Sequence, residues 1–199
     1  MASDHTIKLE KFNEFFSIDC SFNLNINFID EDKIPSYEVF MEQMPLPFKI
    51  ASDIVNLDQA ALKPIQGLDS IAGKLVEYLH HQTQKIDLLV SYIIHQQDDE
   101  QKRFLGVKLG GGGLIFTSSQ PFKNGQHLEL KVFLEHNSCA IYCLGEVIEI
   151  TPAADEHHHT VVFHHIRDED REILVRSSLH EQSKQLQALA QQRSIEKHS

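Results

Sequence analysis

The chain has 199 residues, of which 41% are hydrophobic and 24% are charged, and its formal net charge is -11 at pH 7. These proportions are typical of a globular protein and exclude disorder throughout, and the length suits one full domain with a helical accessory. The negative net charge argues against nucleic-acid binding, because phosphate contacts need a clustered excess of Lys and Arg.

Neither a membrane span nor a secretion signal is visible, because no apolar run is long enough and the first twelve residues lack an apolar core. We therefore expect a cytoplasmic protein. Cys20, Cys139 and Cys143 lack the spacing of a disulfide framework, which favours reduced thiols. In a strand, Cys139 and Cys143 would share a face with Ile141 as small core residues.

Residues 15–29 carry the strongest strand signal. Apolar side chains occupy every second position from Phe16 to Phe28, and the positions between them include Asp19, Asn23 and Asn25. A period of two places one face of a strand in the core and the other in water, so we expect these polar side chains to be solvated.

The next segment, residues 35–52, has a poor pattern, with Pro45 and Pro47 only two residues apart. It is interpreted as an extended crossing segment, with a short edge strand around residues 48–51. A helix is then expected to begin near Asp58 and to kink or restart at Pro64.

Residues 65–93 predict a long helix that keeps one edge against partner helices. Alternating steps of three and four residues join the positions of this heptad seam, which are Ile65, Leu68, Ala72, Leu75, Leu79, Gln82, Ile86, Leu89 and Ile93. Further apolar residues, including Tyr78, Val90 and Tyr92, flank the seam. The apolar face is therefore wider than one partner helix can cover, and we expect more than two helices to meet here.

Such a helix would be roughly 42 Å long, which exceeds the size of a small single core. The alternative is a long core helix that lies across its own domain. Gln82 is the one polar residue of the seam, and a buried amide there would fix register and strand number.

Five strand-like segments follow in quick succession. They are Phe104 to Leu109, Leu114 to Ser118, Leu128 to Glu135, Ala140 to Ile150 and Thr160 to Ile166. The pair Asn124-Gly125 is a turn signal before the third of them. With the early strand they predict a small antiparallel barrel, since closure removes exposed edges. The region after Asp168 predicts a terminal helix.

Together these segments resemble a PilZ domain. The resemblance is carried by Phe12 to Phe28, Val107 to Phe116, Asn124 to Leu130, Leu144 to Val147 and Phe163 to Ile166. PilZ domains are six-stranded barrels that serve as receptors for the bacterial second messenger cyclic di-GMP. A long heptad helix inserted after the first strand is similar to the atypical tetrameric branch of this family.

The resemblance implies an α+β, mainly β, fold. It consists of a six-stranded antiparallel barrel, a long heptad-repeat helix inserted after the first strand, and a C-terminal helix. One domain would cover residues 1–199. The barrel would come from about 12–30 and 103–166, the helical oligomerisation insertion from about 53–97, and the terminal helix from about 168–193.

Two ligand motifs of the family are degenerate in this chain. The Arg-x-x-x-Arg pair that clamps phosphate and guanine falls on Asn13 and Ser17. The second motif, Asp or Asn, any, Ser, any, any, Gly, falls on residues 108–113, where Lys108 and Gly110 depart from it and Gly113 matches. Each lost charge-assisted bond is worth about 1.5–3 kcal/mol, so we expect weak or absent cyclic di-GMP binding.

Two other features have both a structural and a functional interpretation. The glycines at 110–113 could form an anion-binding nest, or a tight bend or bulge with unusual backbone angles, which we favour. The pair Arg167 and Arg171 repeats the Arg-x-x-x-Arg spacing but opens the terminal helix, so we assign it to a solvated or helix-paired face.

Five histidines invite a metal interpretation, and they are His157, His158, His159, His164 and His165. No carboxylate or cysteine pair stands beside them at a familiar spacing, so an exposed hairpin end is favoured over a metal site. We find no nucleophile elbow, metalloprotease pair or phosphate loop. No enzyme activity, catalytic residue, metal or cofactor is therefore expected.

The functional hypothesis is a non-enzymatic adaptor of the cyclic di-GMP network whose own nucleotide site is lost. It would form a homo-oligomer, expected to be a tetramer, and contact pilus, flagellar or biofilm machinery, as the resemblance implies. One alternative is a genuine receptor with a non-standard pocket, for which Lys108 and Arg103 are the first candidate cations. The other is a structural or metal-responsive assembly module.

Overall fold

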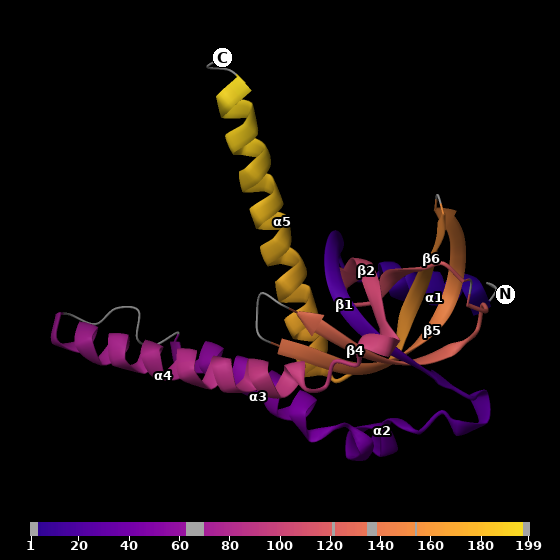
Figure 1. The fold of residues 1–199 in the computed structure, drawn as a ribbon, viewed down its shortest axis with the longest axis horizontal. Coiled ribbons are helices and arrows are strands. Elements are labelled where there is room, and N and C mark those ends of the chain that lie inside the picture. The colour runs from indigo at the N-terminus through magenta and orange to yellow at the C-terminus, as the bar shows by residue number, and fades with distance from the viewer. Residues whose placement is uncertain (1–3, 63–69, 121, 135–138, 154, 197–199) are drawn as a thin grey trace.

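The computed structural model describes residues 4–62, 70–120, 122–134, 139–153 and 155–196. Six antiparallel strands close into a barrel in the order β1-β2-β3-β6-β5-β4 (Figure 1). The strands are β1 (Ser17–Ile29), β2 (Arg103–Gly110), β3 (Gly113–Ser118), β4 (His127–Leu134), β5 (Cys139–Ala153) and β6 (Glu156–His165). Because β1 pairs with both β2 and β4, the barrel has no free edge. The predicted six-stranded barrel is confirmed.

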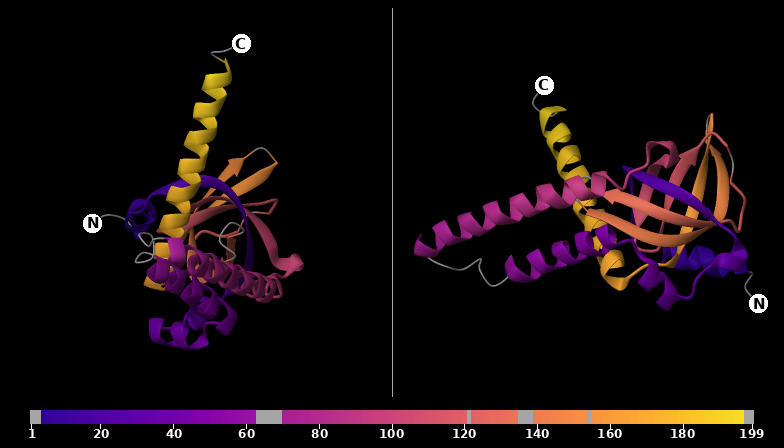
Figure 2. Two further views of the ribbon diagram at one scale, coloured as in Figure 1. Left: turned by 90° about the vertical axis from the view of Figure 1, so that its left-hand side faces the viewer. Right: turned by 60° about the horizontal axis from the view of Figure 1, so that its bottom comes forward.

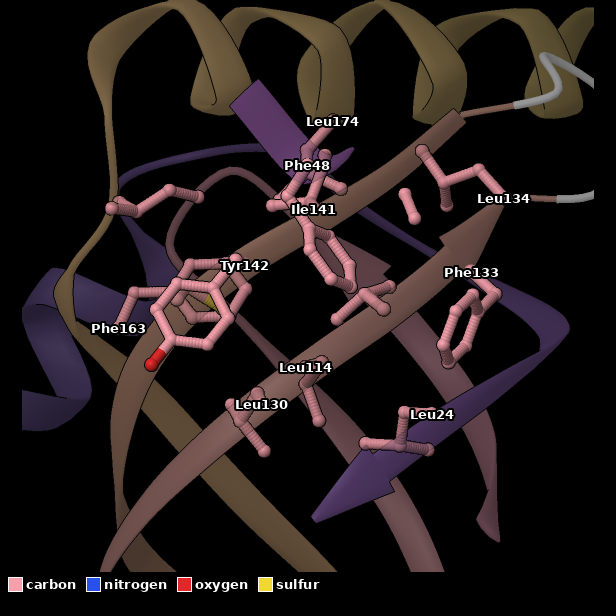
Figure 3. Packing of buried hydrophobic residues seen from close by; sticks show 14 of the residues in the cluster. Leu24, Phe48, Leu114, Leu130, Phe133, Leu134, Ile141, Tyr142, Phe163 and Leu174 are labelled. Atoms are coloured by element: carbon pink, nitrogen blue, oxygen red, sulfur yellow. The ribbon is translucent and has the colours of Figure 1, made fainter. Parts of the chain in front are cut away.

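The barrel is filled by alternate side chains of its strands. Leu24 of β1, Leu114 of β3 and Leu130 of β4 are fully buried and point into one cluster (Figure 3). The clean alternation along residues 128–132 follows from the period of a strand, which turns every second side chain inward. Cys139 and Cys143 of β5 are buried free thiols that flank the core residue Ile141.

The alternation in β1 is less regular than the sequence predicts. Phe16, just before the strand, and Phe28 keep large exposed areas, whereas Asn25, expected in water, is buried. The Nδ2 of Asn25 donates to Asp98 Oδ1 at 2.9 Å, and its Oδ1 accepts the backbone N–H of Asp99 at 2.8 Å. The end of the inserted helices covers this polar face of the strand, so the prediction of solvation is wrong for Asn25.

The insertion after β1 is helical from an earlier point than expected. It contains α2 (Tyr37–Gln43), α3 (Leu46–Leu62) and α4 (Ser70–His95), with single 3-10 turns at Glu31–Lys33 (η1) and Glu100–Lys102 (η2). The predicted extended segment and edge strand over residues 35–52 are therefore wrong. Pro47 lies in the first turn of α3, where a helix tolerates proline because that turn needs no internal N–H donor.

The helices α3 and α4 pack side by side and lead away from the barrel (Figure 2). Near the barrel, Val90 and Ile94 of α4 are buried in the main core, together with Phe48 and Ala51 of α3. The predicted long heptad helix after the first strand is confirmed, and its described part begins at Ser70. Positions 65 and 68 of the seam lie outside the described residues.

Besides the inserted helices, α1 (Asp4–Asn13) and α5 (Asp168–Glu196) lie against the outside of the barrel. The helix α1, which the sequence pattern did not predict, contacts β5 and β6, and its Phe12 packs with Ile148 and Val162. The helix α5 contacts β1 and β2, and its distal part leads away from the barrel (Figure 1). The predicted C-terminal helix is confirmed.

Candidate functional site

The four glycines form the bend between β2 and β3 and are buried. Their backbone angles are ordinary, since among the described glycines only Gly125 has a positive φ. They serve close packing: a Cβ on Gly110 would lie 2.7 Å from the carbonyl oxygen of Phe16, and one on Gly113 would lie 2.1 Å from that of Val161. The prediction of a tight bend is supported, but unusual backbone angles are not its cause.

The structure brings the two degenerate motif segments together. Ser17 pairs with Gly110 across β1 and β2. Backbone carbonyls of residues 11 and 12, at the end of α1, lie within 2.6 Å of a Cβ built on Gly112. The two segments that the resemblance assigns to ligand binding are therefore neighbours in the fold.

The motif side chains make local contacts. Asn13 donates from Nδ2 to the carbonyl oxygen of Leu9 at 3.0 Å, within α1. The Lys108 ammonium lies 3.6 Å from Asp19 Oδ1, and Arg103 binds Asp98 with a shortest N to O distance of 2.7 Å. Both cations suggested for a non-standard pocket thus have carboxylate partners.

Arg171, which the sequence pattern assigns to a solvated or helix-paired face, contacts both motif segments. Arg171 of α5 donates from Nη1 to the carbonyl oxygen of Gly111 at 2.6 Å, and its guanidinium lies 5.1 Å from the ring centroid of Phe15. Val175, one turn further along α5, approaches Gly111 from the same side. The expectation of a solvated or helix-paired Arg171 is wrong, since this side chain crosses to the glycine bend.

A second cation lies close to this contact. Burial and the neighbouring Arg171 charge lower the pKa of Lys11, and Glu14 opposes them. Lys11 is near the C-terminal end of α1, where the helix dipole favours positive charge. The two cations thus lie close enough for Arg171 to disfavour the charged form of Lys11, and Glu14 partly offsets this effect.

The second candidate site is the heptad seam of α4. Leu79, Ile86 and Ile93 are each 44% exposed and Leu89 is 65% exposed, while Gln82 is half-buried. The side chains of Ala72 and Leu75 are outside the described set. Tyr78, Leu88 and Tyr92 add further exposed apolar area beside the seam. An apolar surface of this kind usually marks an interface.

Beside the seam, the two inserted helices enclose an apolar groove of about 200 Å³. Leu46, Pro47 and Ile50 line it from α3, and Val90 and Ile93 line it from α4. The groove lies between the exposed seam and the end of the α3–α4 hairpin that is buried against the barrel.

The remaining chemistry-bearing residues do not assemble into a reactive site in the described part of the chain. No three His, Cys, Asp or Glu side chains there are grouped to hold a metal ion. Burial raises the pKa of the Cys139 thiol to about 12 and that of Cys20 to about 11, which disfavours the reactive thiolate. None of the described helices is long and apolar enough to cross a membrane.

Comparisons with known proteins identify the barrel. The family model described as "PilZ domain" matches residues 80–180, a segment that covers β2 to β6 and the first part of α5. Comparison with curated proteins gives no match.

Among known structures, the chain is similar to a pathogenic protein from Xanthomonas campestris described as a new tetrameric PilZ domain self-assembled via a helical bundle. The TM-score is 0.52 at 13% identity, over 91% of this chain and 96% of that one.

Partial matches are found to the Bacillus subtilis inhibitor of motility MotI/DgrA (TM-score 0.39, 19% identity, 41% of this chain) and to YcgR from Escherichia coli in complex with c-di-GMP (TM-score 0.38, 14% identity, 45% of this chain). The alignments span only 42% and 39% of those two chains. With the family match over half of its length, the chain belongs to the PilZ domain family.

Proposed function

We propose that this protein is a non-enzymatic adaptor of a bacterial cyclic di-GMP network, located in the cytoplasm. Its own nucleotide site is lost, and it acts through protein contacts, with pilus, flagellar or biofilm machinery as the class of partner. Self-association through the inserted helices presents several barrels on one assembly.

The observation that carries the loss of the nucleotide site is the position of Arg171. Asn13 and Ser17 cannot provide the two permanent charges of an arginine clamp. The guanidinium of Arg171 instead covers Phe15 and binds the carbonyl of Gly111, and Val175 packs beside it. A nucleotide would have to displace α5 without gaining the bonds of the missing clamp.

The exposed seam supports self-association. Four of its described residues, Leu79, Ile86, Leu89 and Ile93, are large apolar side chains that stay substantially in water in the single chain. Burying apolar area is worth about 25 cal/mol per Å², so a partner helix that covers this surface gains a large driving force. We infer a homo-tetramer, the state that the description of the similar Xanthomonas protein gives for that protein.

Isothermal titration with cyclic di-GMP tests the adaptor proposal. We expect no binding up to about 100 µM ligand, because the loss of several charge-assisted bonds lowers affinity by orders of magnitude. Binding at micromolar or tighter affinity would overturn it. The Arg171→Ala variant serves as a comparison: if it binds while the parent does not, α5 blocks a site that is otherwise competent, and the claim of a lost site fails.

A second candidate function is a cyclic di-GMP receptor with a non-standard pocket. The observation in its favour is that Lys11 lies close enough to Arg171 for its pKa to be lowered, while the Arg171 guanidinium lies over the aromatic ring of Phe15. If the parent protein binds the nucleotide, Lys11→Ala and Arg171→Ala should each weaken binding at least tenfold, whereas Lys108→Ala should leave it unchanged. Loss of binding in Lys108→Ala alone would place the pocket elsewhere.

A further inference from the structure

A buried histidine closes one end of the barrel. His159 of β6 is fully buried, pairs across the sheet with Phe116 of β3, and neighbours Ile150 of β5 in the register. Its imidazole stacks on the Phe116 ring, with centroids 4.7 Å apart and planes 15° apart. The ring is thus fixed within an aromatic environment rather than at an exposed hairpin end, which corrects the expectation for this residue.

The same imidazole accepts a hydrogen bond from Phe122, which follows β3 and precedes β4 in the chain. The backbone N–H of Phe122 donates to Nε2 of His159 at 3.1 Å. Since an N–H donor faces Nε2, this nitrogen must carry the lone pair, and the proton of the neutral ring lies on Nδ1. Nδ1 is buried and has no well-aligned hydrogen-bond partner among the described residues, although the backbone carbonyls of Phe116 and His157 lie near the ring. The geometry therefore selects one neutral tautomer of His159.

Phe122 in turn covers the aromatic end of the barrel. Its ring lies 5.0 Å from Phe116, 5.7 Å from Phe104 and 5.2 Å from Phe28, and 4.9 Å from the His159 ring. These residues come from β1, β2, β3 and β6, so a single connection residue touches four strands. Any loss of the bond between Phe122 and His159 acts on this whole cluster.

The charges around His159 do not favour its protonation. Burial lowers the pKa of His159; the backbone carbonyls of Phe116 and His157 oppose this effect, while the neighbouring His157 and His158 add to it. His157 is the nearest titratable ring, with centroids 6.3 Å apart. Glu149 on β5 and Lys123 after Phe122 are exposed. Phe104 and Phe116, from β2 and β3, bring no charge, and no carboxylate is among the described groups that act on the His159 ring.

We propose that His159 is a proton-sensitive latch, which in its neutral form holds Phe122 over the aromatic end of the barrel and on protonation releases it. A proton on Nε2 turns the acceptor of the Phe122 N–H into a donor, so the hydrogen bond is lost and a charge is left buried. The connection must then move until the imidazolium reaches water. This movement uncovers Phe104 and Phe116, which together with the already exposed Phe28 form an apolar surface.

The direction of the pH dependence follows from linkage. The unfolded chain takes up the His159 proton near the ordinary value of about 6.5, whereas the folded state takes it up only at lower pH. The stabilisation by the neutral ring is therefore complete above that value. This stabilisation is lost as the pH falls from about 6.5 toward the lowered pKa of His159 in the folded state.

Amide hydrogen exchange of the full chain between pH 7.5 and 5 tests the latch, with rates corrected for intrinsic pH dependence. We expect the protection of amides in residues 122–126 to fall at least tenfold at the acidic end. His159→Gln keeps a side-chain acceptor but cannot titrate, so its protection should not vary with pH. His158→Gln removes only a minor influence on the His159 pKa and retains the latch, so this variant should still lose protection on acidification. An equal acid-induced loss in His159→Gln, or none in the parent, would overturn the proposal.

A measurement without substitution guards against a variant that fails to fold. Nitrogen chemical shifts of the His159 ring at pH 7.5 should report a protonated Nδ1 and an unprotonated Nε2. A proton on Nε2 at this pH would contradict the latch whatever the exchange data show.

Discussion

Arg167 and Asp170 form a bidentate ion pair in the interior of the protein. Nε of Arg167 donates to Asp170 Oδ2 at 3.0 Å and Nη2 donates to Oδ1 at 2.9 Å, with the two side chains only 4% and 1% exposed. Nη1 donates to Asp53 Oδ1 of α3 at 3.3 Å. One guanidinium therefore connects the end of β6, the first turn of α5 and the inserted hairpin.

The two carboxylates of this network should differ in their contribution to stability. Asp170→Ala leaves a buried guanidinium without its main partner, and we expect the free energy of unfolding to fall by about 3–5 kcal/mol. Asp53→Ala is the matched control. Because the Asp53 side chain is 55% exposed, we expect its loss to cost about 1 kcal/mol or less. Urea denaturation at one fixed protein concentration measures both, and equal losses would contradict a buried pair with Asp170 as the main partner.

The seam of α4 predicts a sharp change of mass in solution. Replacing Ile86 and Leu89 together with Asp places two charges in a surface that we propose to be buried between subunits, so the assembly should dissociate into folded monomers. Sedimentation velocity measures the mass, and circular dichroism shows whether the fold is kept. Gln84→Asp, at an exposed polar position of the same helix, should leave the mass unchanged. A parent protein that sediments as a single chain would refute the interface.

The parts of the fold that were predictable have strong periodic patterns. Period-two alternation located the strands, and the heptad spacing located α4, because both patterns reflect which face is apolar. The pattern does not predict α2 and the part of α3 before Asp58, because Pro45 and Pro47 indicate a break, whereas a proline in a first turn is compatible with a helix. Local propensity alone could not distinguish these two uses of proline.

The parts of the site that were not predictable depend on contacts between distant segments. The spacing of Arg167 and Arg171 was visible, but nothing local indicates that Arg171 reaches Gly111, a residue 60 positions away. The same holds for Asn25, whose partners follow 73 and 74 positions later. For both residues the sequence shows a polar side chain, and only the fold shows that it is buried or bridging.

The glycine bend should tolerate no side chain. In Gly113→Ala the new Cβ would lie 2.1 Å from the carbonyl oxygen of Val161, so backbone must move, and we expect a loss of about 1–3 kcal/mol or more in the free energy of unfolding. Gly73→Ala is the contrasting variant. A Cβ there meets nothing within 4 Å in the single chain, and alanine in a helix interior should add about 0.5–1 kcal/mol. Thermal or urea denaturation compares the two, and a neutral Gly113→Ala would disprove the close approach of β3 and β6 at this point.

Asn25 should matter more than its strand neighbour Asn27. Asn25 makes three hydrogen bonds to the segment after α4, through Asp98 Oδ1, the Asp99 carbonyl and the Asp99 N–H, at 2.8–3.0 Å. In Asn25→Ala the Asp98 carboxylate, which is only 8% exposed, and the backbone of Asp99 lose these bonds, and we expect a cost of about 2–3 kcal/mol.

Asn27 is the matched control because it makes one bond, to Glu129 Oε1 at 2.8 Å, and is half-buried. Its loss should cost about 1 kcal/mol. Because Asn25 fastens the root of the inserted hairpin to β1, its removal should also increase amide exchange over residues 96–103, and Asn27→Ala should not. If exchange in that segment is unchanged in Asn25→Ala, the hairpin is held by its apolar contacts, Val90 and Ile94 among them, and the polar clamp is dispensable.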